Sequence, residues 1–491
     1  MSPKNAFAYF GRILKVREMT KFIGRKKELE SLKGLLQKTS SSLVVIRGRR
    51  RIGKSRLAEE YASSFSKAYI LSGIPPEPGV TAAAQRAEFL RQLQEYRLPI
   101  YRSDDWGNLF YDLAQECKKG RVLVVLDEIK WMSSEDPTFL PKLKAAWDRY
   151  FKHNPQFVMV LSGSNSAWIS KNILSSTGFF GRVSLRLLLE ELTLPECNAF
   201  WADRSGTISA YEKFKILSVT GGVPRYLEEL RPDLSAEANL QRLCFDSEGL
   251  LFREFDQIFH DLFQKQGEFY KRIVENLIDS PLSAAELAAK LGRSRGGDLS
   301  KALGELMESG FLARNYTWSF ATAKRLESSR YRIRDNYLRF YLRYIFPHKE
   351  QILSTQLKRL PSGWLSIMGV QFENLVVNNG SLVSQVLGVA PEDVLIANIY
   401  FQTAGTRKRG CQIDYLIQTR FRCLYACEVK FRQGVIGTEV IHEVEEKLNR
   451  LILPRGFSCR PVLLHVNGVS EEVVDSGYFA RIIDLSELLN N

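Results

Sequence analysis

The sequence lacks the features that would place this protein outside a cell or in a membrane. Its seven cysteines are scattered, an odd number without the paired spacing of metal ligands, which argues against a disulfide framework and a structural zinc site. No apolar run approaches the roughly 20 residues needed to cross a bilayer. The N-terminal stretch has no continuous apolar core and no small-residue cleavage site. We therefore expect a cytoplasmic protein without a membrane partner.

The composition indicates a large, well-packed chain with a basic surface. The 491 residues are 45% apolar and 25% charged, and a chain of this length predicts roughly three to four domains. The formal charge of +14, from 69 basic and 55 acidic residues, makes an anionic partner plausible, nucleic acid first.

A glycine-rich loop between an apolar strand and a helix predicts a nucleotide site. Gly48 and Gly53 frame four residues and are followed by Lys54 and Ser55, the pattern of a phosphate-binding loop. The backbone N–H groups would face the β-phosphate, Lys54 would reach the β- and γ-oxygens, and Ser55 would ligate Mg²⁺. The expected nucleotide-binding residues are Gly48, Arg49, Arg50, Arg51, Ile52, Gly53, Lys54, Ser55 and Arg56.

Two later apolar strands predict the rest of the ATP-hydrolysing site. The strand over 122–126 ends in Asp127, a candidate Mg²⁺ ligand through water, and Glu128, a candidate general base. The next strand ends in polar residues, so Ser164 or Asn165 would lie beside the γ-phosphate and orient the water, unless it only forms a strand-end turn. Buried strands separated by helical stretches predict an α/β fold with a parallel sheet.

The chain resembles the archaeal-type P-loop ATPases, which are AAA+/STAND-like proteins. The resemblance rests on sequence boxes in the family's order: FIGRKKELESL (22–32), GRRRIGKS (48–55), VVLDE (124–128), LSGSNSAWI (161–169), FFGR (179–182) and TGGVPRYLEEL (220–230). It also extends over the C-terminal half.

The resemblance implies further site residues. It places Ile23, Gly24 and Arg25 near the adenine pocket. Gly222 and Pro224 would seat a helical lid against the nucleotide. Arg182 would be an arginine finger or γ-phosphate sensor, with a structural salt bridge as the alternative. These roles come from the family resemblance alone.

Residues 280–314 predict a winged helix-turn-helix. Ser283 and Glu286 form the sequence of a capping box, and two short amphipathic helices are followed by the start of a strand. Residues 271–345 carry 14 basic and 8 acidic residues. Arg293, Arg295 and Lys301 would contact phosphates if the module docks on DNA; the alternative is a protein-packing module. The helical spacing of Tyr337, Phe340, Tyr341 and Tyr344 indicates a packing face.

The C-terminal part resembles the PD-(D/E)xK nuclease core. Asp414 and Glu428 lie on two strands of an expected hairpin, and Lys430 shares a face with Glu428. Together with Glu373 on a preceding helix, Asp414 and Glu428 would bind Mg²⁺ or Mn²⁺, while Lys430 would activate a water. The tripeptide alone is not specific, because Glu-x-Lys recurs at 116–118 and 445–447. Ile413 stands where the nuclease pattern has a proline.

These parts predict a Mg²⁺-dependent ATPase that couples its nucleotide state to DNA binding and metal-dependent DNA cleavage. The alternatives are a STAND-like regulatory switch with a non-catalytic C-terminal adaptor, and a motor whose C-terminal domain only grips DNA. Arg49 to Arg51 would form a docking surface for a neighbouring subunit or for the chain's own C-terminal domains. The expected domains are an N-terminal arm (1–20), the ATPase core (21–205), a helical lid (206–270), the winged helix (271–347) and the nuclease-like domain (348–491).

Overall fold

The computed structural model describes residues 22–490, apart from 76, 78, 100–103, 264–266, 294–295, 358 and 405–408. The predicted N-terminal arm and Arg295 therefore lie outside the described residues. The chain divides into two compact units, of which the first includes 53–163 and 172–188, and the second includes 48–52, 164–171 and 189–491. Among the described residues, no helix is both long and apolar enough to span a bilayer.

The first unit is built on a parallel sheet, as predicted. Its five strands lie in the order β2-β3-β4-β1-β5, so the phosphate-loop strand and the Asp127 strand are separated by one strand. β1, β3 and β4 are almost wholly buried, as expected for parallel strands covered on both faces. The strands are β1 (Ser42–Arg47), β2 (Lys67–Ser72), β3 (Val122–Asp127), β4 (Phe157–Gly163) and β5 (Val183–Leu188).

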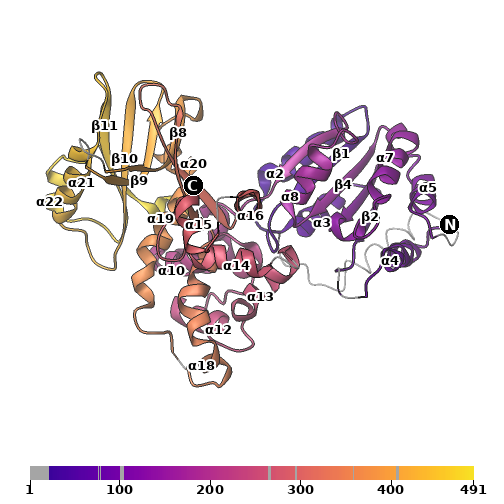
Figure 1. Cartoon of the computed structure of the whole chain (residues 1–491), viewed down its shortest axis with the longest axis horizontal. Helices are drawn as coiled ribbons and strands as arrows, with labels where there is room; N and C mark the ends of the chain where they lie inside the picture. The colour runs from indigo at the N-terminus through magenta and orange to yellow at the C-terminus, as the bar shows by residue number, and fades with distance from the viewer. Residues whose placement is uncertain are drawn as a thin grey trace. The chain divides into compact units, whose positions relative to one another are not determined.

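Helices pack against this sheet (Figure 1). The phosphate-loop helix α3 packs on β3 and β4, and α4 packs on β2. Asp105 caps α5, where its carboxylate accepts from the N–H groups of Gly107 and Asn108. The helices of this unit are α2 (Lys26–Gly34), η1 (Leu35–Gln37), α3 (Lys54–Ala62), α4 (Ala82–Glu95), α5 (Trp106–Glu116), α6 (Ile129–Met132), α7 (Phe139–Arg149) and η2 (Phe151–His153).

The second unit begins with a helical part that shares one apolar core with the elements after it. Its early helices are α8 (Ser166–Ile169), η3 (Ser170–Leu174, which continues into the first unit), α9 (Leu194–Asn198), η4 (Ala199–Thr207), α10 (Ala210–Thr220), α11 (Pro224–Leu227), α12 (Ala236–Cys244), α13 (Leu250–Phe263) and α14 (Gly267–Glu275). The predicted lid over 206–270 is thus helical.

Two helices and a hairpin follow, where the helix-turn-helix was predicted. They are α15 (Ala284–Lys290), α16 (Gly297–Glu308), β6 (Leu312–Trp318) and β7 (Arg325–Ile333), and Leu282 forms a bridge with Tyr331 of the hairpin. The predicted capping box of Ser283 and Glu286 is confirmed. The predicted packing face is also confirmed, because Tyr337, Phe340, Tyr341 and Tyr344 are all buried.

A mixed sheet closes the second unit, in the order β12-β11-β10-β9-β8. β9 and β10 pair antiparallel, as predicted, while β10 and β11 pair parallel. Helix α19 packs on β10 and α21 contacts β9. The strands are β8 (Val394–Gln402), β9 (Cys411–Thr419), β10 (Cys423–Phe431), β11 (Ser458–Val466) and β12 (Arg481–Asp484). The helices are α17 (Asn336–Phe340), η6 (Tyr341–Ile345), η7 (Phe346–His348), α18 (Lys349–Leu353), η8 (Trp364–Ile367), α19 (Met368–Asn378), α20 (Gly380–Val386), η9 (Pro391–Asp393), α21 (Glu439–Arg450), α22 (Glu471–Asp475) and η10 (Leu485–Leu489).

Candidate functional site

Asp127 and Ser55 meet at the carboxyl edge of the first sheet. Ser55 Oγ donates to Asp127 Oδ2 at 2.6 Å, and Ser162 Oγ donates to Asp127 Oδ1 at 2.6 Å. Asp127 is 7% exposed and Ser162 is fully buried. A hydroxyl and a carboxylate held this closely are the hard oxygen ligands that Mg²⁺ prefers. The residues present therefore fit the predicted cation.

The phosphate loop leads directly into α3. Gly53 has a φ of 90° and caps the helix, which starts at Lys54, a buried lysine. A left-handed backbone at this point suits glycine, and the first turn of a helix is where N–H groups bind phosphate oxygens in nucleotide sites. Glu128 also adopts a left-handed backbone, with a φ of 48°, and directly precedes α6. Its role as general base stays a prediction.

The arginines between the two loop glycines contact the second unit, to which residues 48–52 belong. Arg49 is 5% exposed and pairs with Asp335 and, at 3.4 Å, with Glu191. Its guanidinium also lies 5.3 Å from the centre of the Phe311 ring. Burial opposes the charge of Arg49, but the neighbouring Asp335 and Glu191 raise its pKa, so the guanidinium stays protonated.

Arg51 forms a second anchor in the same unit. It has a φ of 69° and makes a bidentate pair with Glu254, with three N–O distances of 3.0 to 3.1 Å. Glu254 is 1% exposed and also accepts a hydrogen bond from the Tyr226 hydroxyl at 3.1 Å. The sequence left open whether these arginines dock on a neighbouring subunit or on the chain's own C-terminal domains. In the structure, the side chains of Arg49 and Arg51 contact the chain's own C-terminal half.

The predicted lid element connects to this network through Glu191. The N–H of Gly222 donates to Glu191 Oε2 at 3.0 Å, and the Leu192 N–H donates to the Gly222 carbonyl at 2.8 Å. A Cβ at Gly222 would lie 2.3 Å from the Leu192 carbonyl oxygen, so no other residue fits. Pro224 is the first residue of α11, where its missing N–H costs nothing.

The remaining residues of the expected nucleotide site are divided between the two units. Ile23 and Gly24 precede α2, and Arg25 is buried and pairs with Glu28 at 3.1 Å. A Cβ at Gly48 would approach the Leu189 carbonyl oxygen to 2.5 Å. Elsewhere in the loop, Ile52 is fully buried, Arg50 is half-buried, and Arg56 pairs with Glu59. Their contacts with a nucleotide stay predictions.

Arg182 and Asn165 have structural partners. Arg182 donates to both carboxylate oxygens of Asp148 at 2.9 Å. This is the structural salt bridge that was the alternative to an arginine finger. Asn165 caps α8, because its Oδ1 accepts from the Trp168 N–H at 2.8 Å. A role for either residue beside the γ-phosphate stays a prediction.

We expect Arg182→Ala to have a small effect. The hydrogen bonds from Arg182 lower the pKa of Asp148 to about 2, so the pair stabilises the fold above pH 4 and its contribution is lost as the pH falls through about 2. For a partly exposed pair, the loss at neutral pH should be below about 1 kcal/mol. ATP turnover should change by no more than about twofold. A hundredfold loss of turnover at saturating ATP would instead identify an arginine finger.

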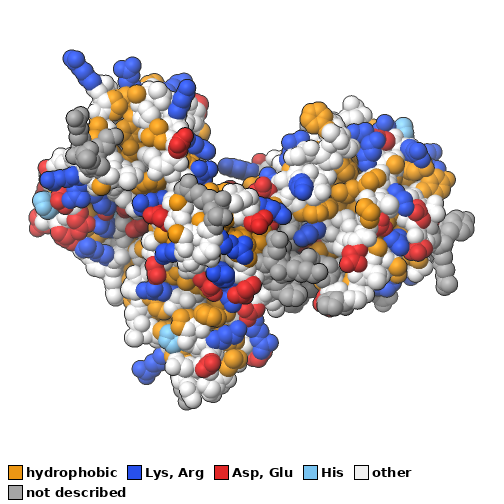
Figure 2. Space-filling view, viewed as in Figure 1, with side chains coloured by type: hydrophobic (Ala, Val, Ile, Leu, Met, Phe, Trp, Pro, Cys, Tyr) orange, Lys and Arg blue, Asp and Glu red, His pale blue; other side chains and the backbone are white. Residues whose placement is uncertain are grey.

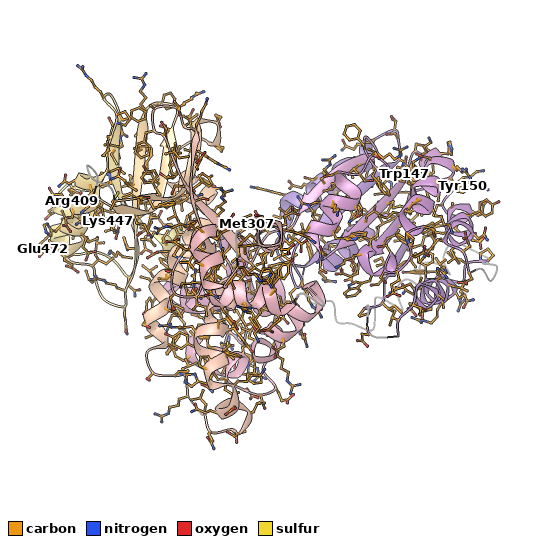
Figure 3. All side chains as sticks on the ribbon, viewed as in Figure 1. Trp147, Tyr150, Met307, Arg409, Lys447 and Glu472 are labelled. Carbon is orange, nitrogen blue, oxygen red and sulfur yellow. The ribbon has the colours of Figure 1, made fainter. Side chains whose placement is uncertain are left out.

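Carboxylates and lysines converge on the C-terminal sheet. Asp414 of β9 and Glu428 of β10 are 8% and 4% exposed. Lys447 of α21, labelled in Figure 3, lies 2.5 Å from Glu428 and 3.7 Å from Asp414. Lys430 contacts Glu428 at 3.0 Å and Glu443 at 2.6 Å. Two ammonium groups therefore neutralise the two carboxylates that were expected to bind metal.

Glu373 belongs to the same electrostatic cluster. Burial, with Asp414 and Glu428 nearby, raises the pKa of Glu373 to about 8. Burial and Glu428 likewise raise the pKa of Asp414 to about 6. In the described part of the chain, however, no group of three or more His, Cys, Asp or Glu side chains is arranged to hold a metal ion. The role of Glu373, Asp414 and Glu428 as a set of metal ligands stays a prediction.

Sequence reasoning missed the acidic partners of the loop arginines and the lysine at the C-terminal cluster. Glu191, Glu254 and Asp335 belong to no sequence motif, and only their ion pairs with Arg49 and Arg51 in the folded chain identify them. Lys447 lies in the recurrent Glu-x-Lys at 445–447. The signal for Lys447 was its place one helical turn after Glu443 on an amphipathic helix, which follows the Glu428 strand.

Comparison with known proteins finds an ATPase domain in this chain. The family described as an ATPase domain predominantly from Archaea matches residues 22–230. The uncharacterized protein MJECL04 of Methanocaldococcus jannaschii is 24% identical over 362 residues, which cover 72% of this chain and 76% of that protein. The matched segment contains the phosphate loop, Asp127, Glu128 and Gly222. Residues 22–230 thus resemble an archaeal-type ATPase domain.

Two solved structures show a weaker likeness. The Walker-type ATPase PABY2304 of Pyrococcus abyssi is 15% identical, with a TM-score of 0.46, over 66% of this chain and 96% of that one. The ORC2 protein of Aeropyrum pernix, in its ADPNP–ADP complexes, is 14% identical, with a TM-score of 0.41, over 68% of this chain and 97% of that one.

Proposed function

We propose that this protein is a Mg²⁺-dependent ATPase that couples its nucleotide state to DNA binding and to metal-dependent DNA cleavage by its C-terminal domain. The observation that carries the coupling is the pair of anchors inside the phosphate loop, the buried Arg49 and the half-buried Arg51. If the loop rearranges when it binds phosphates, Arg49 and Arg51 move with it. Their ion pairs then transmit the movement to the segments that contain Asp335 and Glu254.

Hydrolysis follows from the residues at the edge of the first sheet. Lys54 and the first N–H groups of α3 bind the β- and γ-phosphate oxygens. Ser55 and Asp127 would hold Mg²⁺, which would supply positive charge to the phosphate oxygens. Glu128 accepts the proton of the attacking water as general base. The in-line displacement then releases inorganic phosphate.

DNA binding rests on residues 271–347 as a winged-helix module. The order α14, bridge residue Leu282, α15, α16 and the β6–β7 hairpin fits such a module. Arg293 and Lys301 are exposed and line one depression of the surface beside α16. Lys and Arg side chains also project from the part of the surface around β8 to β11 (Figure 2). Basic side chains on these elements would contact phosphates.

Cleavage would take place at the Asp414–Glu428–Lys430 cluster of the C-terminal PD-(D/E)xK-like domain. A divalent cation there would activate a water for attack on the phosphodiester. Asp414 and Glu428 lie on adjacent antiparallel strands, and Lys430 and Lys447 are both within reach of Glu428. For a cation to bind there, Lys447 would have to leave the two carboxylates. Its ammonium group would then be available to an oxygen of the scissile phosphate.

The second candidate is a regulatory ATPase switch whose C-terminal domain is a non-catalytic adaptor. The specific observation in its favour is the ion pair of Lys447 with both Asp414 and Glu428. The ammonium group of Lys447 neutralises the two carboxylates without a metal ion. Such an ion-paired cluster can stabilise the fold of an adaptor domain that has no catalytic activity.

One experiment separates the two candidates. Wild-type, Lys54→Ala and Asp414→Ala proteins are incubated with plasmid and linear DNA, with Mg²⁺ or Mn²⁺, with and without ATP. We expect metal-dependent nicking that falls at least about a hundredfold in Asp414→Ala, because removing one ligand removes the cation. Asp393→Ala, which removes a carboxylate paired with Arg420 at the surface, should cut like wild type.

The pH dependence provides a further check on the same site. Metal binding requires ionised carboxylates, and the raised pKa values of Asp414 (about 6) and Glu373 (about 8) mean that both are protonated at low pH. Nicking at fixed Mn²⁺ should therefore rise between pH 6 and pH 8. Nicking that persists in Asp414→Ala contradicts the nuclease site, and ATP turnover without any nicking favours the switch.

A further inference from the structure

An open cavity in the second unit lies apart from the residues assigned above to ATP and to metal. Its volume is about 320 Å³, and it is formed by the end of α16, the β6–β7 hairpin, α19 and the strands β8 and β9. Met307, labelled in Figure 3, belongs to its wall. The polar lining residues that matter here are Arg332, Arg334, Asn378 and Asn398.

Arg332 is a buried cation that has no acidic partner in the described part of the chain. Its side chain is 6% exposed. Nε donates to Asn315 Oδ1 at 3.0 Å and Nη1 donates to Asn374 Oδ1. Both acceptors are neutral amides, and within the described residues no carboxylate pairs with this guanidinium. A buried charge is costly unless an opposite charge compensates it.

The surroundings add positive charge. Arg339 is also buried, and its recorded partners are the neutral Gln371 Oε1 at 3.0 Å and the Ile333 carbonyl at 2.7 Å. Arg334, at the rim, pairs with the exposed Glu190 at 2.8 Å. Burial, with Arg339 and Arg334 nearby, lowers the pKa of Arg332 to about 9, against a smaller opposing effect of Glu373. The guanidinium is therefore still charged at neutral pH.

We propose that this cavity is a binding site for a phosphate oxyanion, either inorganic phosphate or a phosphomonoester group. Arg332 supplies the buried counter-charge, because its planar fork of donors matches phosphate oxygens. Arg334, with the Asn378 and Asn398 amides, supplies donors from three other parts of the wall. The volume is at the lower end of the roughly 300–1,000 Å³ of small-ligand sites. A phosphate group together with the sugar to which it is attached would fill this cavity.

The ligand has two possible sources, a free phosphorylated small molecule and the terminal phosphate of a nucleic-acid strand. Calorimetric titration uses inorganic phosphate first, then a trinucleotide with a 5′-phosphate and the same trinucleotide with a 5′-hydroxyl. All proteins carry Lys54→Ala, so that the phosphate loop contributes little. Binding of the 5′-phosphorylated strand alone identifies the strand end as the source, whereas binding of inorganic phosphate without that preference identifies the small molecule.

In this background, Arg332→Gln is expected to weaken phosphate binding about tenfold or more, the effect of losing a charged hydrogen-bond donor. Asn398→Asp, at a half-buried position, should weaken it similarly by placing a negative charge in the cavity. Arg481→Gln removes the same charge from an exposed position on β12 and should bind like the parent. Thermal melting shows whether each variant is folded.

Should Arg332→Gln fail to fold, Asn398→Asp still tests the proposal. Phosphate affinity unchanged in every folded cavity variant overturns it. The absence of saturable phosphate binding by the parent protein also overturns it. Neither outcome bears on the ATPase or on the cleavage proposal, because neither Lys54 nor Asp414 lines the cavity.

Discussion

Replacing Lys54 by alanine is expected to lower ATP turnover by roughly 100- to 1,000-fold, because a positioned cation on the β- and γ-phosphate oxygens is lost. The side chain is buried, so its attraction to phosphate is stronger than that of a solvated lysine. It also starts α3, where the helix dipole would act on the same oxygens. Release of inorganic phosphate at saturating ATP and Mg²⁺ measures the effect.

The matched control is Lys152→Ala. Lys152 is an exposed lysine of the same unit, in η2, and its loss should leave turnover unchanged. Thermal melting of both variants shows that the fold is intact. Wild-type turnover in Lys54→Ala would contradict the assignment of the loop to ATP, and it would do so whatever the C-terminal domain does.

The second large effect is expected for Arg49→Ala, which should lower the free energy of unfolding by about 3–5 kcal/mol. Asp335 is 1% exposed, and the Glu191 side chain is 17% exposed. Without Arg49, a buried carboxylate remains with no compensating cation, and the stacking of the guanidinium on Phe311 is lost as well. Chemical denaturation followed by tryptophan fluorescence measures the change.

Arg253→Ala is the control for this prediction. Arg253 pairs with Glu248 at the surface of the same unit, with both side chains more than half exposed, so its loss should cost less than about 1 kcal/mol. The double variant Arg49→Met with Asp335→Asn removes both buried charges and should recover much of the stability. Equal losses in Arg49→Ala and Arg253→Ala would show that the buried pair does not anchor the loop.

Local patterns predicted much of the first unit. An unbroken apolar run predicts a strand buried on both faces, and β1, β3 and β4 are such strands. The outer strands β2 and β5 were not predicted. β5 is only half-buried, with exposure alternating along it, because an edge strand has fewer neighbours and so a weaker apolar signal.

The C-terminal sheet shows the same limit at its polar cluster. Alternation along 410–431 predicted the β9–β10 hairpin and put Asp414 and Glu428 on neighbouring strands, which the register confirms. The lysine between them was not foreseen. Lys447 comes from α21, and its ion pair with Asp414 depends on how that helix packs on the sheet. The spacing from Glu443 puts Lys447 on one face of a helix, but only the packing of that helix decides which carboxylates the face meets.

The sequence by itself determined the nucleotide loop, its strand and helix, and the acidic end of β3, because glycine, lysine and apolar runs act on the backbone within a few residues. Only the tertiary structure decided what the loop arginines do. Their acidic partners stand 142, 203 and 286 residues further along the chain. The sequence shows that these positions are positively charged. Only the tertiary structure shows which carboxylates neutralise Arg49, and that Arg332 has no carboxylate partner among the described residues.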